Sequence, residues 1–271
     1  MNAAPGHLHP NVQETARPVL AAHNLTLDYA GQNSRLRALE DVSFTVAERE
    51  RLVLLGPSGC GKSSILKALA GFLKPAGGRV EMRGAKITGP GPDRIVVFQE
   101  FDQLLPWKTV RDNVAFPLRI ARKMSRAEAR DRAEAALVKV GLARAIDAYP
   151  HTLSGGMKQR AAIARALAAE PDVLLMDEPF AALDALTRRT LQEDLLALAE
   201  EQQFTLVFVT HAIDEAVLIG TRLHLLAAHP GRTIATFDTS AFSLAERGSP
   251  HFEAVVRDVH NLLFTDGGLH V

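Results

Sequence analysis

The chain has 271 residues, of which 47% are hydrophobic and 23% are charged, and its length suits one large domain or one domain with an inserted subdomain. Lys plus Arg and Asp plus Glu each number 31, so the formal net charge is zero and the basic excess expected of a general nucleic-acid-binding protein is absent from the sequence. The single cysteine, Cys60, excludes a disulfide within the chain and is typical of a reducing compartment.

Residues 1–17 contain Pro, Gly, His and Asn but no apolar core segment, so we predict a flexible N-terminal tail and no secretory signal. The sequence shows no run of about 18 apolar residues, so we expect no membrane-spanning segment. The N-terminal third then shows the composition of strands and one helix, separated by turn residues. The predicted strands are 19–29, 35–46, 51–55, 79–83 and 94–98, and the predicted helix is 63–70.

A helical block follows between two sheet strands. Ser125 and Glu128 form an S-x-x-E capping box ahead of an apolar face with a period of 3.6 residues. A second helix is predicted over 154–169. We interpret the stretch from about 107 to 170 as an inserted helical subdomain.

The C-terminal third alternates strands with helices, which is typical of a mostly parallel sheet with right-handed crossovers. Strands are predicted at 173–176, 204–209, 223–227 and 233–237, and helices at 186–201 and 213–219. The expected fold class is therefore α/β. Residues 241–271 are predicted to form a short C-terminal helical extension.

Residues 56–63 read Gly-Pro-Ser-Gly-Cys-Gly-Lys-Ser, directly after a predicted strand. The pattern G-x-x-x-x-G-K-S between a strand and a helix is the phosphate-binding loop of nucleotide triphosphatases; the alternative is a chance glycine-rich turn. Lys62 is predicted to reach the β- and γ-phosphates, and the Ser63 hydroxyl to ligate Mg²⁺. The predicted nucleotide contacts in this loop are Gly56, Pro57, Ser58, Gly59, Cys60, Gly61, Lys62, Ser63 and Ser64.

Cys60 lies inside this loop and has two interpretations. We favour a small side chain that fills the loop. The alternative is a reactive thiol whose pKa is lowered by the phosphate-binding amides and by Lys62.

Two carboxylates, Asp177 and Glu178, follow the hydrophobic run 173–176. Ligands of open α/β sheets bind at the C-terminal ends of strands, so these acids are candidates for the site. Asp177 is predicted to orient Mg²⁺ and its water shell, and Glu178 to polarise the water that attacks the γ-phosphorus. The alternative is a pair of solvated loop acids.

A second anion site is predicted where residues 153–160 read Leu-Ser-Gly-Gly-Met-Lys-Gln-Arg. Ser154 caps a helix, and Gly155 and Gly156 leave the helix N-terminus bare. A monomer has no evident use for two phosphate sites and one set of catalytic acids. We therefore predict a head-to-tail homodimer in which each nucleotide lies between one chain's phosphate loop and the other chain's Ser154 helix.

In combination, these motifs resemble the nucleotide-binding subunit of ATP-binding cassette (ABC) transporters. The family signature is L-S-G-G-x-x-Q-R, after G-P-S-G-C-G-K-S and before L-L-M-D-E-P, and the resemblance covers about 19–240. It implies a P-loop NTPase fold with a RecA-like parallel-sheet core, an N-terminal antiparallel β-subdomain and the inserted helical subdomain, together forming an ABC ATPase domain over 18–240. It also implies ATP and Mg²⁺ as the bound nucleotide and metal.

The resemblance implies roles for further residues. Tyr29 matches the aromatic residue that stacks on adenine, and Gln99 matches the glutamine that contacts Mg²⁺ and senses the γ-phosphate. His211 matches the switch histidine that holds the γ-phosphate, although Ala212 follows it where many relatives have an acid. Taken singly, Tyr29 and His211 would each be ordinary surface or packed side chains. The implied catalytic residues are Lys62, Glu178 and His211, the metal ligands Ser63, Gln99 and Asp177, and the contacts in trans Ser154, Gly155, Gly156 and Gln159.

The segment 101–118 is apolar for a loop region and carries the only tryptophan, Trp107. Such segments mark partner contacts, although packing inside the helical subdomain is an equal alternative. In ABC transporters this stretch lies in the groove that receives the coupling helix of the membrane subunit. The chain looks most like the importer subfamily for nitrate, sulfonate and taurine in three stretches of sequence: around Trp107, at 177–188 and at 229–232.

The resemblance implies an ATP-binding and ATP-hydrolysing subunit that energises uptake of a small anionic solute. Its implied partners are a second copy, two transmembrane permease subunits and a periplasmic solute-binding protein, with no nucleic acid. Its implied location is the cytoplasmic face of the inner membrane. The alternative is a soluble ABC ATPase in DNA repair or translation, which usually needs a long coiled-coil insertion or two cassettes in one chain; this chain has neither.

Overall fold

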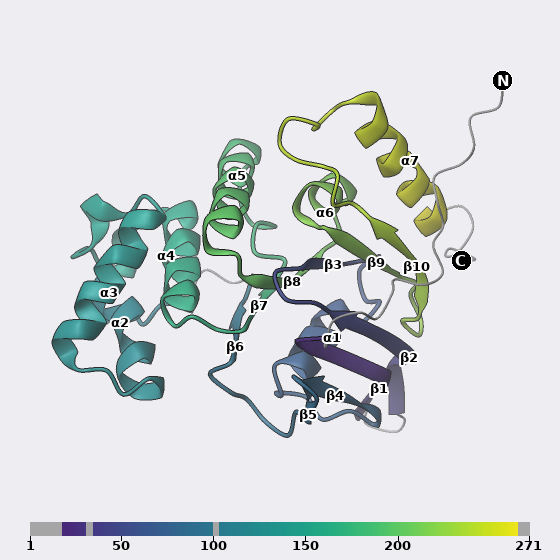
Figure 1. The fold of residues 1–271 in the computed structure, drawn as a ribbon, viewed down its shortest axis with the longest axis horizontal. Helices are drawn as coiled ribbons and strands as arrows, with labels where there is room; N and C mark the ends of the chain where they lie inside the picture. Colours follow the sequence, from purple (N-terminus) through teal and green to yellow (C-terminus); the bar gives the residue numbers. More distant parts are fainter. Residues whose placement is uncertain (1–17, 31–34, 100–102, 265–271) are drawn as a thin grey trace. The chain divides into compact units, whose positions relative to one another are not determined.

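The computed structural model describes residues 18–30, 35–99 and 103–264. The predicted flexible tail, 1–17, and most of the predicted turn after the first strand, 31–34, lie outside the described residues. The strands traced in Figure 1 are β1 (Leu20–Ala30), β2 (Arg35–Val46), β3 (Arg51–Leu55), β4 (Gly77–Met82), β5 (Ala85–Lys86), β6 (Arg94–Val97), β7 (Val173–Asp177), β8 (Thr205–Thr210), β9 (Arg222–Leu226) and β10 (Thr233–Asp238). The helices are α1 (Lys62–Leu69), α2 (Val110–Ala121), α3 (Arg126–Lys139), α4 (Gly155–Ala168), α5 (Ala185–Gln202), α6 (Ile213–Ile219) and α7 (Pro250–Phe264), with short 3-10 turns at Ala143–Ala145 and Pro150–Thr152.

The chain divides into two compact units. The first is formed by the described residues of Met1–Leu69, Leu73–Ile87 and Val209–Val271, and the second by those of Ala70–Phe72 and Thr88–Phe208. Neither unit is one continuous stretch of sequence. Strand β8 belongs to both, because the boundary falls between Phe208 and Val209.

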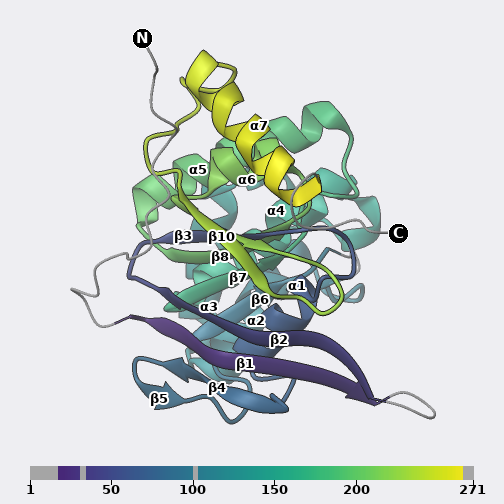
Figure 2. The same cartoon turned by 90° about the vertical axis from the view of Figure 1, so that its right-hand side faces the viewer.

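The first unit contains an antiparallel sheet with strand order β2-β1-β4-β5. Figure 2 shows β1 lying between β2 and β4. The β1–β2 register pairs Leu20 with Val46 at one end and Tyr29 with Leu36 at the other. Asn24 interrupts the pairing with a left-handed φ of 47°, and its backbone N–H donates to the Ser43 hydroxyl at 2.8 Å. The antiparallel pairing places Tyr29 at the far end of β1.

The first unit also contains the strands β10, β9 and β3, which are hydrogen bonded in that order. β3 pairs with β9 in parallel, with Leu52 opposite Arg222, and β9 is antiparallel to β10. Residues Leu52 to Leu55 are fully buried, as expected for a strand covered on both faces. Helix α6 packs against β3, and α7 packs against α6 through a buried apolar face formed by Phe252, Val259 and Leu263.

The second unit holds the strands β8, β7 and β6, adjacent in that order. β6 and β7 are parallel, with Val97 opposite Met176. The first four residues of β7 are fully buried, and α4 packs against both β6 and α5. Asp177 is the last residue of β7, so its carboxylate stands where the apolar strand ends.

Helices α2, α3 and α4 of the second unit pack on one another. The predicted capping box is confirmed, because the Ser125 hydroxyl accepts from Glu128 N–H and the Glu128 carboxylate accepts from Ser125 N–H. No described helix of the chain is long and apolar enough to cross a membrane.

Helix α2 corrects the interpretation of 101–118 as a loop region. A helix forms from Val110 despite Pro117 in its interior, because Thr109 caps it by accepting from Asp112 N–H at 3.1 Å. Asn113 accepts from the Leu105 N–H at 2.7 Å and so holds the preceding turn against the helix. The buried side chains of α2 recur every four residues at Val110, Val114 and Leu118, so the apolar sequence provides a packing face.

His224 in β9 is expected to make stability depend on pH. Burial, reinforced by nearby Arg222, lowers the pKa of His224 from 6.5 to about 4. The unfolded chain therefore binds this proton more tightly than the folded chain. Stability should be complete above pH 6.5 and fall as the pH drops toward 4, by about 2–3 kcal/mol between pH 7.5 and 4.5. Urea unfolding at the two pH values measures this loss.

The matched variant is His224→Gln, which keeps a polar group near the Thr233 hydroxyl that lies 3.0 Å from Nε2 of His224. It should lose a clearly smaller amount of stability over the same pH interval. An equal loss in the two proteins would show that other groups cause the pH dependence.

Candidate functional site

The phosphate loop connects β3 to α1 in the first unit. Gly59 and Gly61 have φ angles of 81° and 94°, a left-handed conformation in which a side chain is strained. The loop ends at Lys62, the first residue of α1, so its final backbone N–H groups belong to a helix N-terminus. The strand, the glycine-rich loop and the helix thus follow one another as the sequence pattern predicted; binding of an anion by their N–H groups stays a prediction.

The Lys62 side chain closes this loop from within. It is only 5% exposed, and its Nζ donates to the carbonyl oxygens of Gly56 at 2.7 Å and Pro57 at 2.9 Å. Both acceptors are neutral. The negatively charged oxygens of a phosphate would be stronger acceptors for the same ammonium group.

Tyr29 is tied to the helix that follows the phosphate loop. Its hydroxyl lies 2.7 Å from the hydroxyl of Ser64, in the first turn of α1. Tyr29 is nevertheless 38% exposed, so part of its ring is open to solvent. The structure therefore brings together the residue predicted to stack on adenine and the loop predicted to bind phosphates.

Cys60 is completely buried in the loop. Burial raises the pKa of its thiol, and this effect outweighs the opposing influence of Lys62, whose Nζ lies 3.7 Å from Sγ. The interpretation as a small packing residue agrees with this burial. The alternative of a thiol with a lowered pKa is wrong, because burial removes the water that would stabilise the charged thiolate.

His211 follows β8 and also lies in the first unit. The Thr210 hydroxyl donates to the Glu215 carboxylate at 2.5 Å and accepts from the Ala212 N–H at 3.0 Å. These bonds fix the turn between β8 and α6 on both sides of His211. The residue itself is exposed at the end of the strand.

The two acids lie at the end of β7 in the second unit. Glu178 has a left-handed φ of 44°, so the chain turns sharply directly after Asp177. The Glu178 carbonyl accepts from the Ala181 N–H at 3.2 Å and closes that turn. Asp177 thus ends the strand, and Glu178 lies in the turn that follows it.

The Ser154 helix is α4, and its cap forms as predicted. The Ser154 hydroxyl accepts from Met157 N–H at 3.3 Å, and Ser154 is exposed. Gly156 packs against α5, since a Cβ there would lie 2.7 Å from Cγ2 of Thr187. Gln159 is only 1% exposed, and among the described residues its amide nitrogen and oxygen have no hydrogen-bond partner. Ser154 is therefore presented at the surface. Gln159 lies inside the unit, and this burial corrects the prediction that its side chain contacts nucleotide in trans.

Gln99 follows β6 and is exposed. A second glutamine, Gln103, holds the backbone next to it. The Gln103 side chain accepts from Phe98 N–H at 3.0 Å and donates to the Phe98 carbonyl at 2.6 Å, while Arg165 of α4 donates to the Gln103 carbonyl at 2.6 Å. The sequence interpretation missed Gln103 and Arg165, because no periodicity or motif distinguishes them.

The apolar segment around Trp107 divides into a packed and an exposed part. Trp107 is 71% exposed, and Phe116 and Ile120 on α2 are exposed as well. Lys108 lies over the Phe116 ring, with Nζ 5.1 Å from the ring centroid. One face of α2 therefore packs inside the unit, as one interpretation of 101–118 predicted, and exposed apolar side chains lie on another face; contact of these side chains with a partner stays a prediction.

The donors predicted to hold Mg²⁺ are a hydroxyl, an amide oxygen and a carboxylate, at Ser63, Gln99 and Asp177. These are hard oxygen ligands of the type that Mg²⁺ prefers. Among the described residues, no group of three or more His, Cys, Asp and Glu side chains could hold a metal ion on its own.

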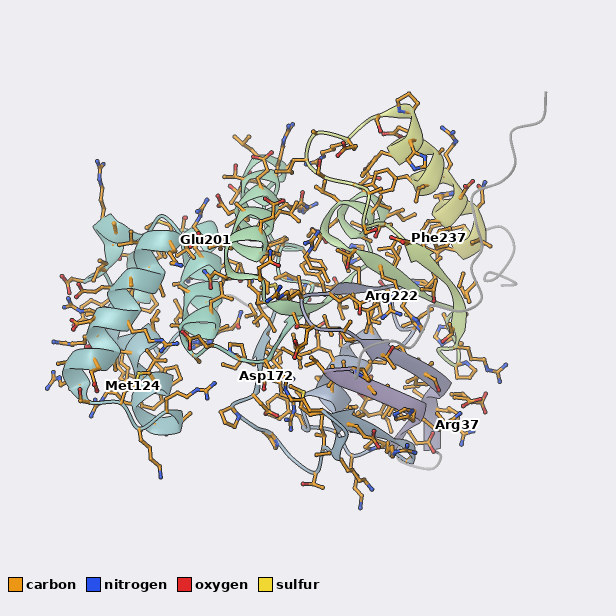
Figure 3. The ribbon with its side chains drawn as sticks, viewed as in Figure 1. Arg37, Met124, Asp172, Glu201, Arg222 and Phe237 are labelled. Atoms are coloured by element: carbon orange, nitrogen blue, oxygen red, sulfur yellow. The ribbon has the colours of Figure 1, made fainter. Side chains whose placement is uncertain are left out.

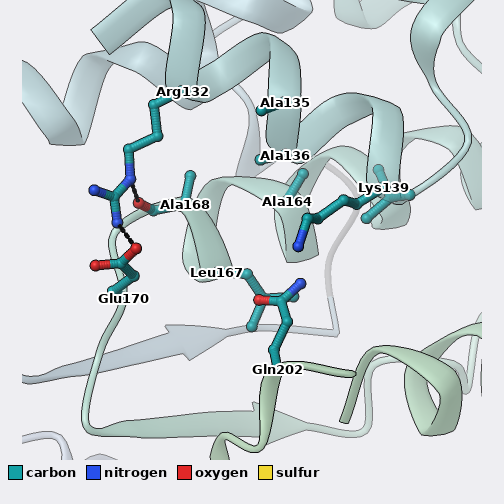
Figure 4. Close-up of a pocket in the computed structure, with 10 residues that line it drawn as sticks. Arg132, Ala135, Ala136, Lys139, Ala164, Leu167, Ala168, Glu170 and Gln202 are labelled. Carbon is teal, nitrogen blue, oxygen red and sulfur yellow. Dashed lines mark hydrogen bonds and ion pairs between the residues drawn. The ribbon is translucent and has the colours of Figure 1, made fainter. Parts of the chain in front are cut away.

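A separate pocket of about 180 Å³ lies between α3, α4 and the end of α5 (Figure 4). Arg132 at its edge donates to the Ala168 carbonyl and pairs with Glu170, and Lys139 pairs with Glu201 outside the lining. None of the predicted site residues lines this pocket. The candidate residues of the first unit are the phosphate loop, Tyr29 and His211, and those of the second unit are Gln99, Ser154, Asp177 and Glu178.

Comparisons with known proteins agree on one family. The family model described as "ABC transporter" matches residues 39–181. The taurine import ATP-binding protein of Rhizobium johnstonii is 44% identical over 254 residues, which cover 90% of this chain and 96% of that protein. The nitrate import ATP-binding protein NrtC of Synechococcus elongatus is 44% identical over 232 residues, covering 83% of this chain and 35% of that protein.

A solved structure with a similar fold is that of the ATP-binding cassette MJ0796. It is a dimeric structure of a post-hydrolysis state, bound to ADP and Pi. Its TM-score with this chain is 0.72 at 34% sequence identity, and the match covers 82% of this chain and 100% of that one.

Proposed function

Because the chain belongs to the ABC transporter family, we propose that its ATP hydrolysis energises uptake of a small anionic solute of the taurine or nitrate type. The similarity to the solved cassette confirms the predicted P-loop NTPase fold, and family membership confirms an ATP-binding subunit whose hydrolysis is coupled to transport. No comparison supports the alternative of a DNA-repair or translation ATPase. The observation that supports the proposal is the phosphate loop, whose left-handed glycines and enclosed Lys62 would bind an anion.

The residues of the loop would bind ATP through its phosphates. The loop's N–H groups and the α1 N-terminus supply neutral donors, and the Lys62 ammonium supplies charge at the β- and γ-phosphates. Tyr29 would stack its exposed ring on adenine while its hydroxyl remains bonded to Ser64. Mg²⁺, held by Ser63, Gln99 and Asp177, would neutralise the charge that develops on the phosphates.

Glu178 would act as the general base that orients and polarises the attacking water. His211, fixed by the Thr210 and Glu215 bonds, would donate to the γ-phosphate oxygens. Gln99, whose neighbouring backbone is held by Gln103, would contact the same phosphate. Binding in this way makes ATP, and not ADP, the ligand that completes the site.

We propose that a second copy contributes the helix N-terminus at Ser154. The dimeric cassette bound to ADP and Pi supports this assembly, and the exposed Ser154 cap is available for it. Gly155 would offer a backbone N–H. Gly156 is packed on α5 and Gln159 is buried, so in the proposed dimer their part is to shape the helix N-terminus that contacts nucleotide in trans.

Ser154→Ala should remove ATP-dependent dimerisation. The test uses a Glu178→Gln background to prevent turnover. Sedimentation velocity with ATP and Mg²⁺ should show a dimer when Ser154 is retained and a monomer when Ser154→Ala is added. The matched control is Ser125→Ala, which removes an equivalent N-cap from α3 and costs about 1 kcal/mol of stability, as Ser154→Ala does. Equal dimer fractions in the two variants would refute the role of Ser154 in trans.

The permease subunits would dock on the exposed apolar surface formed by Trp107, Phe116 and Ile120. Phe116 and Ile120 are four residues apart on α2 and Trp107 precedes the helix, and exposed apolar side chains of this kind fit a protein partner with an apolar helix. The assembly would hold this chain at the cytoplasmic face of the cell membrane, with a periplasmic solute-binding protein delivering the solute. Uptake of labelled taurine and of nitrate into cells that carry either importer but lack its own ATPase subunit tests the solute class. Restoration of neither by this chain would refute this assignment.

A further inference from the structure

The hairpin loop between β9 and β10, residues 227–232, lies along the phosphate loop in the first unit. At its start, Leu226 lies against Gly56, where a Cβ would stand 2.6 Å from the Leu226 carbonyl oxygen. Further along, Cε1 of His229 lies 3.7 Å from the position of a Cβ on Gly59. The phosphate loop therefore lies against the end of β9 at Gly56 and next to the hairpin loop at Gly59.

Gly231 makes the closest approach. A Cβ at Gly231 would stand 2.0 Å from the carbonyl oxygen of Cys60, which is closer than any side chain permits. Gly231 is also fastened to β2: its N–H donates to the Ala38 carbonyl, and its carbonyl accepts from the Glu40 N–H, both at 2.9 Å. The hairpin loop thus connects a strand of the antiparallel sheet to the phosphate loop.

An ion pair reinforces this connection. Arg232 pairs with the Glu40 carboxylate, which also accepts from Arg37 at 2.9 Å; Arg37 is labelled in Figure 3. Hydrogen bonds from Arg232 and Arg37 lower the pKa of the Glu40 carboxyl. The three side chains are partly or largely exposed, so the backbone bonds of Gly231 contribute the more dependable part of the attachment.

The contact at Gly231 determines the orientation of one peptide plane. The carbonyl and the N–H of a trans peptide point in opposite directions, and among the described peptide bonds only His229–Pro230 is cis. The Cys60 carbonyl points to Gly231, so the N–H of Gly61 points away from the hairpin loop. Phosphate loops bind their ligand through N–H groups of this kind.

We infer that the hairpin loop 227–232 is a brace for the phosphate loop, and that Gly231 is a positioning residue that turns the Gly61 N–H toward the bound phosphates. This inference rests on the proposed nucleotide site. His229, which lies next to Gly59, completes the brace. The ligand recognised through it is a polyphosphate, independently of the base.

Gly231→Ala tests the brace, because the added Cβ must displace either the Cys60 carbonyl or the bonds to β2. Titration calorimetry of the full chain with ATP and with inorganic tripolyphosphate should show affinity reduced about tenfold or more for both ligands, the contribution of one charge-assisted hydrogen bond. The matched control is Gly89→Ala, since a Cβ there meets nothing within 4 Å. A folded Gly231→Ala variant that binds both ligands within twofold of wild type would overturn the inference.

His229→Ala keeps the backbone of the brace and remains informative if Gly231→Ala does not fold. It should bind both ligands about threefold more weakly, whereas a purely structural role would lower the free energy of unfolding and leave affinity unchanged. If His229→Ala bound ATP and tripolyphosphate with wild-type affinity, the contribution of the brace to phosphate binding would be overturned. Failure of the wild-type chain to bind either ligand would instead overturn the proposed function together with this inference.

Discussion

Glu178→Gln is expected to bind ATP like the wild type and to hydrolyse it about 10²–10⁴ times more slowly, a barrier increase of about 3–5 kcal/mol. Glutamine has nearly the same shape as glutamate, so it preserves the turn after β7 and the packing of the strand. It cannot accept the proton of the attacking water. Steady-state release of phosphate gives kcat, and equilibrium titration with ATP gives the affinity.

The control is Glu170→Gln. Glu170 shares the left-handed backbone of Glu178, with a φ of 46°, but its carboxylate pairs with Arg132 in the helical part of the second unit. Any cost of placing glutamine in this conformation is therefore present in both variants. If Glu178→Gln retained wild-type turnover, or if both variants lost it equally, Glu178 would not be the general base.

Lys62→Met should weaken ATP binding by about 10²–10⁴-fold, because two hydrogen bonds to charged phosphate oxygens contribute about 3–6 kcal/mol together. Methionine retains most of the buried stem of the lysine and removes the ammonium. In the nucleotide-free protein the change also leaves the Gly56 and Pro57 carbonyls without their donor. Thermal unfolding with increasing ATP measures the loss, since stabilisation by a ligand follows its affinity.

Lys67→Met provides the comparison for this result. Lys67 lies in the last turn of α1, on an exposed position of the same helix. The substitution Lys67→Met changes the charge of the chain by the same amount as Lys62→Met and leaves the phosphate loop unchanged. An ATP affinity equally reduced in both variants would indicate a general effect of charge, and the specific role of Lys62 would be wrong.

Much of the fold could be predicted where one physical signal dominates. The strand at 51–55 and the helix at 213–219 have the predicted bounds, and each is followed directly by a glycine, Gly56 or Gly220. The capping box at Ser125 followed from local spacing alone. Helix α2 was harder to predict because Pro117 argues against a helix, and the cap at Thr109 and the Asn113 bonds that offset it are recognisable only once the turn has formed.

The site shows the same division. The phosphate loop and the Ser154 cap are local, so their sequence patterns contain most of the physics. The Gln103 bonds, the burial of Gln159 and the approach of Gly231 to Cys60 depend on segments far apart in the sequence. The sequence pattern His-Pro-Gly-Arg at 229–232 indicated only a resemblance to the nitrate, sulfonate and taurine importer subfamily. Its contact with the phosphate loop is long-range and leaves no periodic pattern.

The parallel pairing of β3 with β9 has a consequence for biosynthesis. Arg51 and Thr221, which are bonded at the beginning of the two strands, are 170 positions apart. At translation rates of about 5–20 residues per second, β3 leaves the ribosome about 10–30 s before β9 exists. During that interval β3, in which four of the five residues are apolar, lacks β9 as a neighbour, so nascent chains of this protein are natural clients for chaperones that shield strand edges. A stop codon before residue 222 would leave β3 permanently without that neighbour.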